Sequence, residues 1–282
     1  CMVARMDVHL SPKGLAMPEY SMAPTGEKFP LPEKKDHATE MRRLRRLVKK
    51  ARGEDKEIVV VMGVGFVGAV MAAIVADTVH KKGKRKGEPS KFVIGCQRPS
   101  PRSYWKIPLL NRGESPVKAE DPEVDPMITR CVKDKKTLTA TFNSDCLALA
   151  DCVVVDVQCD YAKAELGNMR TGEAEMSALE ATMRTIGDKI PPKCLVLIET
   201  TVAPGTTEFV AWPILKKAFE ARGIDSEPVL AHSFERVMPG REYVSSIRDF
   251  WRVCAGCNDT ARERVETFLH EVLNTDEFPL TV

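Results

Sequence analysis

The most informative stretch of the chain is Ile58-Val-Val-Val-Met-Gly-Val-Gly-Phe-Val-Gly68. Its first five residues are apolar and mostly β-branched, which is typical of a short buried strand. The next six follow the pattern Gly-x-Gly-x-x-Gly, and the mostly apolar residues 69–79 have a length that suits a helix. The sequence therefore predicts a strand, a tight turn and a helix in that order, which is the opening unit of a dinucleotide-binding fold.

Each glycine of this turn has a separate physical reason. Gly63 allows the tight turn, Gly65 lets a pyrophosphate approach the backbone, and Gly68 lets the helix lie close to the strand. The phosphates then face free N–H groups at the helix N-terminus, where the helix dipole favours negative charge. We expect these glycines, with Phe66 and Val67 between them, to bind the cofactor. The alternative is a glycine-rich turn that holds no ligand.

Residues 58–76 form an uncharged run of 19 residues, which is long enough to span a bilayer. Basic residues flank this run on both sides, at 49–52 and 81–86. The glycine turn divides the run into a strand and a helix, however, and the chain has no second hydrophobic span. We therefore predict no contact with a membrane.

The composition excludes several classes of protein. Of the 282 residues, 43% are hydrophobic and 29% are charged, so the chain is neither disordered nor fibrous. A net charge of +2 is too even for a protein that coats nucleic acid. The nine cysteines are an odd number scattered through apolar runs, which indicates reduced thiols in the cytoplasm. Since the chain begins at Cys1 and stops inside an apolar run at Val282, we expect it to be part of a longer protein.

Beyond the glycine turn, apolar strands alternate with helical patterns, which predicts a parallel sheet covered by helices on both faces. The fold class is thus α/β, a doubly wound Rossmann-type sheet. We divide the chain into a basic N-terminal arm with an amphipathic helix (1–56), the dinucleotide-binding domain (57–258) and the start of a truncated helical central domain (259–282). The expected strands are 58–62, 91–95, 137–142, 152–157, 194–198 and 229–231, and the expected helices are 69–79, 144–150, 173–188 and 206–221.

The end of the second strand should read the ribose of the adenosine half. A carboxylate is usual there, but this strand ends in Gln97 and Arg98. A neutral amide bonds ribose hydroxyls more weakly than a carboxylate does, and Arg98 can accept a 2′-phosphate. The expected cofactor is NAD, with NADP left open.

Four later segments narrow the class of protein. Residues 199–207 read Glu-Thr-Thr-Val-Ala-Pro-Gly-Thr-Thr, and residues 233–240 read Ser-Phe-Glu-Arg-Val-Met-Pro-Gly. Residues 111–116 read Asn-Arg-Gly-Glu-Ser-Pro, and residues 252–256 read Arg-Val-Cys-Ala-Gly. Together with the glycine turn, these segments resemble the UDP-glucose/GDP-mannose dehydrogenase family over residues 57–282. The departures are Phe234 for the usual proline and Thr200 for the usual serine.

The resemblance implies an NAD-dependent enzyme that oxidises the C6 alcohol of a nucleotide-diphosphate hexose to the uronic acid through two hydride transfers. It places Thr201 at a catalytic water, Glu235 near the reacting carbon, and Thr200 among the cofactor-binding residues. Both catalytic candidates follow predicted parallel strands, whose carboxyl ends bind ligands in open α/β sheets.

Other features of the family are missing from this chain. The resemblance implies a cysteine nucleophile and a dimer formed through a long central helix, but no matching motif occurs here. An alternative is therefore a non-catalytic NAD(H)-binding module. A short-chain epimerase or reductase is excluded because no tyrosine begins a Tyr-x-x-x-Lys pattern. We interpret Cys254 and Cys257 as buried thiols and predict no metal site, because no second ligand pair lies at zinc spacing.

Overall fold

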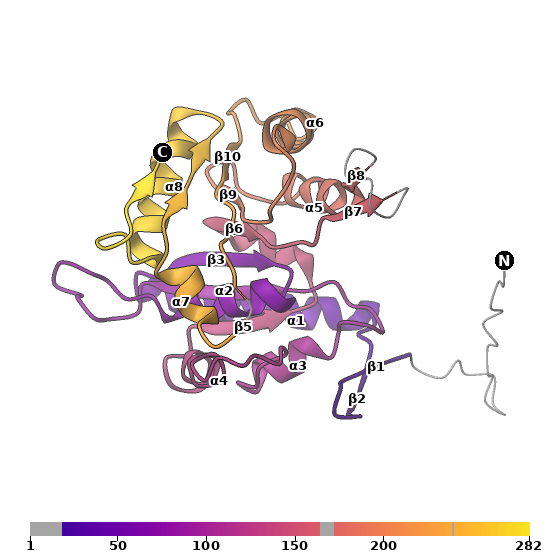
Figure 1. Ribbon diagram of the computed structural model, residues 1–282. Coiled ribbons are helices and arrows are strands. Elements are labelled where there is room, and N and C mark those ends of the chain that lie inside the picture. The colour runs from indigo at the N-terminus through magenta and orange to yellow at the C-terminus, as the bar shows by residue number, and fades with distance from the viewer. Residues whose placement is uncertain (1–18, 164–171, 239) are drawn as a thin grey trace.

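The computed structural model describes residues 19–163, 172–238 and 240–282. A seven-stranded sheet forms its centre, with strand order β12-β10-β9-β6-β3-β4-β5. All neighbours are parallel except β12, which pairs antiparallel to β10 (Figure 1). The strands are β3 (Glu57–Met62), β4 (Lys91–Cys96), β5 (Leu138–Thr141), β6 (Cys152–Val155), β9 (Leu195–Ile198), β10 (Val229–His232) and β12 (Ala255–Gly256).

The order of the parallel strands is that of two mononucleotide-binding halves. From β3 the chain adds β4 and β5 on one side, and then returns to add β6, β9 and β10 on the other. This is the doubly wound Rossmann order, whose direction reverses between β3 and β6. The fold class predicted from the sequence is confirmed.

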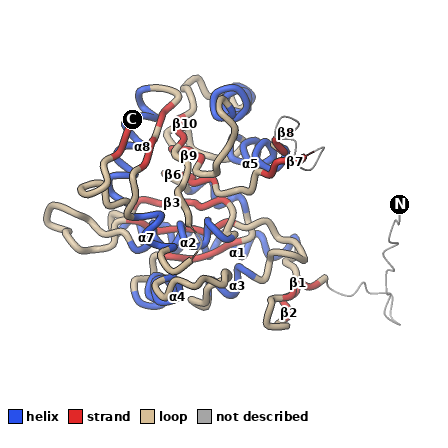
Figure 2. The backbone as a smooth tube through the Cα atoms, in the orientation of Figure 1, coloured by secondary structure: helices blue, strands red, loops and turns tan. Residues whose placement is uncertain are grey.

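Helices cover both faces of the sheet because alternate side chains of each buried strand point to opposite faces. One face packs against α2, α3, α4, α7 and α8, and the other packs against α1, η2, α5 and α6 (Figure 2). The helices are α1 (Lys34–Gly53), α2 (Phe66–Asp77), α3 (Lys106–Asn111), α4 (Val124–Thr129), α5 (Ser177–Gly187), α6 (Trp212–Ala221), α7 (Tyr243–Arg248) and α8 (Asp259–Val272), with short π- or 3₁₀-helical turns at η1 (Arg130–Asp134), η2 (Ser144–Leu149) and η3 (Thr207–Ala211).

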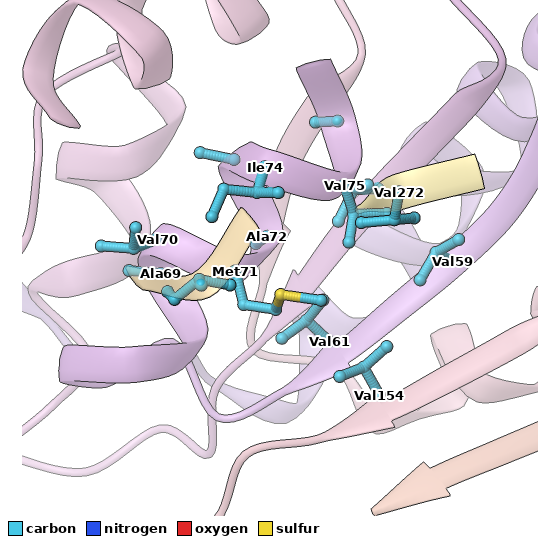
Figure 3. Packing of buried hydrophobic residues seen from close by; sticks show 14 of the residues in the cluster. Val59, Val61, Ala69, Val70, Met71, Ala72, Ile74, Val75, Val154 and Val272 are labelled. Carbon is cyan, nitrogen blue, oxygen red and sulfur yellow. The ribbon is translucent and has the colours of Figure 1, made fainter. Parts of the chain in front are cut away.

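Helix α2 is apolar all round and almost completely buried. Met71 of this helix lies over Val61 and Val154 of the sheet, and Val75 meets Val272 of α8 (Figure 3). This burial explains the uncharged run of residues 58–76, which is a buried strand and a buried helix. In the described part of the chain, no helix is long and apolar enough to cross a membrane.

Helix α1 is amphipathic, as predicted. It buries Met41, Leu44, Val48 and Ala51 against the sheet while most of its basic residues face solvent. The capping box between Glu33 and Asp36 fixes its first turn. The basic residues of α1 are thus mainly the exposed side of a packed helix.

Three small two-stranded sheets lie outside the central one. They pair β1 (Tyr20–Met22) with β2 (Lys28–Pro30), β7 (Asp160–Lys163) with β8 (Gly172–Glu175), and β11 (Arg252–Val253) with β13 (Leu280–Thr281). Two expectations are corrected here. Residues 20–30 form a hairpin held by the buried Ser21 hydroxyl, which donates to Pro101 O, where an irregular arm was expected. The helix expected from residue 173 begins at Ser177, whose N–H donates to the Glu175 carboxylate.

The C-terminal helix α8 packs on the central sheet. Ala261, Val265, Phe268 and Leu269 are buried in the same cluster as α2. The division of the chain at residue 258 stays a prediction, but α8 shares the core of the sheet. Residues 1–18 of the expected arm lie outside the described residues.

Candidate functional site

The residues that directly follow five parallel strands form one continuous row along the carboxyl edge of the sheet. Each N–H in this row donates to a carbonyl of the neighbouring strand, at 2.9–3.2 Å. Because the strands are parallel and in register, these residues lie side by side. In order across the sheet they are Gln97, Gly63, Asp156, Glu199 and Ser233.

Gly63 and Gly68 are required by close backbone contacts. Gly63 has φ +97°, and a Cβ there would lie 2.6 Å from the carbonyl oxygen of Asp156. A Cβ on Gly68 would lie 1.8 Å from the carbonyl oxygen of Gly63. These contacts bring the start of α2 against the ends of β3 and β6, as the sequence predicts for the first and third glycines.

Gly65 is different because it faces open space. It is the N-cap of α2 without any side-chain cap, and a Cβ there would meet nothing within 4 Å. No acidic residue occupies the first turn of α2, and Phe66 is 43% exposed beside it. Val67 lies half-buried in the same turn. Free N–H groups, a favourable helix dipole and room at Gly65 fit a pyrophosphate.

The ring of Phe66 is held by a residue that the sequence analysis missed. Tyr243 of α7 stacks on Phe66 with 4.8 Å between ring centroids, and its hydroxyl donates to Phe66 O at 2.7 Å. Burial raises the pKa of Tyr243, and the acidic residues Glu235 and Asp156 raise it further. The phenol therefore stays a neutral donor that fixes the first turn of α2.

Gln97 takes part in the turn itself. Its Oε1 accepts the N–H of Val64 at 3.1 Å, so the amide oxygen stabilises the glycine turn. Arg98 is exposed at the end of the same strand. The structure thus places both residues at the edge where the ribose is expected, and it gives Gln97 a second role that the sequence did not reveal.

The two adjacent threonines after β9 have different surroundings. The Thr200 hydroxyl donates to Val157 O at 2.8 Å and to Val155 O at 3.2 Å, so it ties the segment to the end of β6. Thr201 is exposed and lines a pocket of about 340 Å³. Glu235 lines the same pocket, and the structure therefore brings the two predicted catalytic residues together.

The Glu235 side chain is oriented by its own loop. Its Oε2 accepts the N–H of Val237 at 2.5 Å, and its backbone N–H donates to Glu199 O at 3.1 Å. The remaining pocket walls are mostly apolar or aromatic, with Arg236 held 4.8 Å from the centre of the Phe250 ring. A carboxylate and a hydroxyl that share one pocket can hold a water molecule or move a proton.

Beneath this pocket lies a buried group of charges, which the sequence analysis also missed. Glu199 and Arg252 are 0% and 2% exposed, and their side chains form an ion pair at 2.7 Å. Arg252 also donates to Phe234 O at 2.5 Å. Asp156 lies beside Glu199, and neither of its carboxylate oxygens has a hydrogen-bond partner among the described residues.

Burial changes the protonation of these acids. Desolvation raises the pKa of Asp156 well above its usual range, the nearby Glu199 and Glu235 raise it further, and Arg252 opposes the shift. Burial also raises the pKa of Glu199, against the pull of the Arg252 guanidinium. Burial without a hydrogen-bond or cationic partner among the described residues thus favours the neutral acid form of Asp156, while Glu199 has a direct cationic partner in Arg252.

The remaining candidates carry less chemistry. His232 lies 3.3 Å from the Thr207 hydroxyl, and burial followed by the charge of Arg252 lowers its pKa, so the ring is neutral. Burial raises the pKa of Cys254 and of Cys257 to about 11, so both thiols stay protonated at neutral pH. Cys254 is buried as expected, whereas Cys257 is only half-buried. No group of three or more metal-ligating side chains occurs among the described residues.

Comparison with known proteins identifies the family of this chain. Residues 57–274 match the model of the UDP-glucose/GDP-mannose dehydrogenase family, NAD binding domain. The chain belongs to this family. Its cofactor is accordingly NAD, as predicted, and the glycine turn with the open N-terminus of α2 fits that cofactor.

Individual relatives agree. The NDP-N-acetyl-D-galactosaminuronic acid dehydrogenase of Methanosarcina mazei is 32% identical in its solved structure, with a TM-score of 0.67 over 84% of this chain and 46% of that one. The UDP-N-acetyl-D-mannosamine dehydrogenase of Pyrococcus horikoshii is 33% identical over 94 residues, which are 33% of this chain and 22% of that protein. The GDP-mannose dehydrogenase of Pseudomonas aeruginosa, at 19% identity and a TM-score of 0.59, shares the fold. The chain spans less than half the length of these relatives.

Proposed function

We propose that the complete protein oxidises the C6 alcohol of a nucleotide-diphosphate hexose to the uronic acid, with two hydride transfers to NAD. The observation that carries the proposal is the shared pocket of Thr201 and Glu235 at the carboxyl edge of the sheet. The two relatives at 32% and 33% identity support the substrate class, since each is named for a nucleotide-linked sugar.

In this proposal, each site residue has a role that follows from its position. The open N-terminus of α2 at Gly65 holds the pyrophosphate, and the nicotinamide accepts the hydride when NAD is bound. Glu235, oriented by Val237 N–H, moves the proton of the alcohol or of a water molecule. The exposed Thr201 hydroxyl holds that water molecule in the acid-forming step.

Further parts of the proposal concern the complete protein. The cysteine nucleophile of the second oxidation, and the central helix through which the protein forms a homodimer, come from a part of the protein outside this sequence. We place the protein in the cytoplasm, which agrees with the free cysteines among the described residues. Size-exclusion chromatography of the complete protein tests the dimer.

The enzymatic proposal is tested with the complete protein and a panel of UDP- and GDP-hexoses. We expect two NADH per uronic acid formed, with Glu235→Gln and Thr201→Ala lowering turnover by ~10²–10⁴ and changing NAD affinity little. Glu227→Gln is the matched control, because this glutamate is exposed on the surface. Wild-type turnover in Glu235→Gln, or no NADH formation with any nucleotide sugar, would contradict the proposal.

A further inference from the structure

Buried polar atoms without partners are concentrated at one place in the molecule. Among the described residues, six buried side-chain nitrogen or oxygen atoms lack a hydrogen-bond partner. Five of them lie at the carboxyl edge of the sheet, on Asp156, Glu199, Ser233 and Arg252. Since native proteins rarely leave buried polar atoms unpaired, this concentration points to a ligand or to a functional charge.

The topology places these residues under one half of the dinucleotide. The adenosine half belongs to β3, β4 and β5, because the ribose is read at the end of the second strand, β4. The nicotinamide half therefore lies over β6, β9 and β10, the strands that end in Asp156, Glu199 and Ser233. Asp156 is the member nearest the reversal point, directly beside Gly63.

Several titratable groups on different elements surround Asp156. Glu199 follows β9 and raises the pKa of Asp156, and Arg252 of β11, with which Glu199 is paired, opposes that rise. Glu235 lies in the loop after β10, and Tyr243 of α7 contributes a neutral phenol. The first turn of α2 carries no acidic residue. Asp156 thus has no direct cationic partner among the described residues, and burial of an unpartnered carboxyl group favours its protonated form.

We propose that Asp156 senses the redox state of the cofactor. NAD⁺ carries a positive charge on its nicotinamide ring, and NADH carries none. When the charged ring binds over this half of the sheet, its positive charge favours the ionised form of Asp156: the O–H bond of the carboxyl group breaks and the proton leaves to solvent. NADH binds over the neutral acid. Asp156 is therefore a residue that determines specificity for the oxidised cofactor.

Ionisation linked to binding has a defined pH dependence. NAD⁺ affinity rises with pH by up to about tenfold per pH unit, because one proton is released for each NAD⁺ bound. NADH affinity does not change with pH over the same range. The adenosine half and pyrophosphate are common to both cofactors, so only the ring charge distinguishes them.

The test is calorimetry of the complete protein at pH 7 in two buffers that differ in ionisation enthalpy. We expect NAD⁺ binding to release up to about one proton. NADH and ADP-ribose, which lack the ring charge, release none. Asp156→Asn keeps the size of the side chain, abolishes the release, and removes the pH dependence of NAD⁺ affinity. Asp188→Asn is the matched control, since Asp188 is an exposed aspartate at the end of α5.

Several outcomes overturn the inference. It fails if NAD⁺ binding releases no proton, if ADP-ribose releases as many protons as NAD⁺, or if Asp156→Asn leaves the release unchanged. Infrared difference spectroscopy of the wild type makes the test independent of the variant's folding: NAD⁺, but not NADH, must remove the C=O band of a neutral carboxylic acid. The inference rests on the proposed dinucleotide site. Absence of NAD⁺ binding would overturn both, whereas binding without proton release would overturn only the sensing role.

Discussion

The two edges of the central sheet each hold buried charges, but the charges are arranged differently. At the amino edge, the Lys91 ammonium is 4% exposed and contacts the carboxylates of both Glu57 and Glu271. Arg264 reaches Glu57 as well, at 3.3 Å. At the carboxyl edge, Asp156 has no partner among the described residues, and Glu199 uses only one oxygen on Arg252.

This difference separates structural charges from functional ones. A cavity of about 550 Å³ lies at the amino edge, larger than the pocket of about 340 Å³ beside Glu235. Its charged walls are mostly ion pairs, and among the described residues it holds a single buried unpaired atom, His80 Nε2, against five at the carboxyl edge. Ligands of open α/β sheets also bind at that opposite edge. The unsatisfied atoms mark the functional edge better than the size of the cavity does.

The largest effect on NAD affinity is expected at the carboxyl edge, from a substitution that places an acid where the pyrophosphate binds. Gly65→Asp introduces a carboxylate into open space at the N-terminus of α2. We expect NAD affinity to fall by ~10³-fold, because two or three charge-assisted hydrogen bonds of ~1.5–3 kcal/mol each are lost or opposed. Calorimetry measures the affinity.

Stability should not follow affinity in this variant. The Gly65 Cβ position has no neighbour within 4 Å, so the free energy of unfolding stays within about 0.5 kcal/mol of wild type. Gly53→Asp, at another open glycine, is the control for the substitution itself. NAD binding at wild-type strength in Gly65→Asp would show that the pyrophosphate lies elsewhere.

At the amino edge, a substitution should reduce the stability of the protein and leave its NAD affinity unchanged. Lys91→Met leaves Glu57 and Glu271 without their shared cation, and we expect about 2–3 kcal/mol less stability in urea unfolding. That figure lies below the usual range for fully buried pairs because both acids are partly exposed. NAD affinity stays unchanged. Lys189→Met removes a more exposed ion pair with Asp145 and should reduce stability by less than about 1 kcal/mol.

The pH dependence of this contribution follows from the shift of the Lys91 pKa. Burial lowers that pKa, but Glu57 and Glu271 outweigh burial and raise it overall. The contribution is therefore complete below the ordinary lysine pKa of about 10.4, and it is lost as pH rises through the folded-state value. A constant difference between wild type and Lys91→Met at strongly alkaline pH would contradict this assignment.

Asp156→Asn should stabilise the protein, which is unusual for a buried substitution. The pKa of Asp156 is raised in the folded state, so folding opposes ionisation at every pH above the unfolded pKa of about 3.9. We expect the variant to unfold at a higher urea concentration than the wild type at pH 7, because only the wild-type carboxyl gains its ionisation on unfolding. The gain should vanish near pH 3, where the carboxyl is protonated in both states. A destabilised variant at pH 7 would mean that Asp156 is a structural residue.

The sequence predicted the sheet well because its strands and the glycine turn are local patterns. The apolar strands lie close to where they were expected, and Thr201 and Glu235 share a pocket. Helix α2, however, begins at Phe66, inside the expected turn of residues 63–68, and ends at Asp77, where a helix over residues 69–79 was expected. The buried acid was missed because Asp156 falls inside the run 152–157, which was interpreted as a continuous apolar strand. A single acid inside an otherwise apolar strand can be recognised from the sequence as a candidate buried charge.

Other parts of the site depend on contacts that no local pattern contains. Tyr243 meets Phe66 across 177 positions of sequence, and Arg252 meets Glu199 across 53. The common row of Asp156 and Glu199 exists only because two parallel strands share a register. Such pairings require the assembled sheet, so the sequence identified the individual motifs but not the charge cluster beneath them.

The smallest effect concerns the adenosine half, where the residue that follows β4 is Gln97 instead of an acid. Because Gln97 Oε1 already accepts the Val64 N–H, the amide supports the turn. Gln97→Glu keeps an acceptor at the same reach and adds a charge that repels a 2′-phosphate. We expect the affinity ratio of NADP to NAD to fall about fivefold, which is roughly 1 kcal/mol. Arg98→Ala should weaken NADP alone and by less, since Arg98 is exposed, and Arg102→Ala is its control. If neither substitution changes the ratio in binding titrations, the ribose is not read at the end of β4, and the contrast between the two halves rests on Asp156 alone.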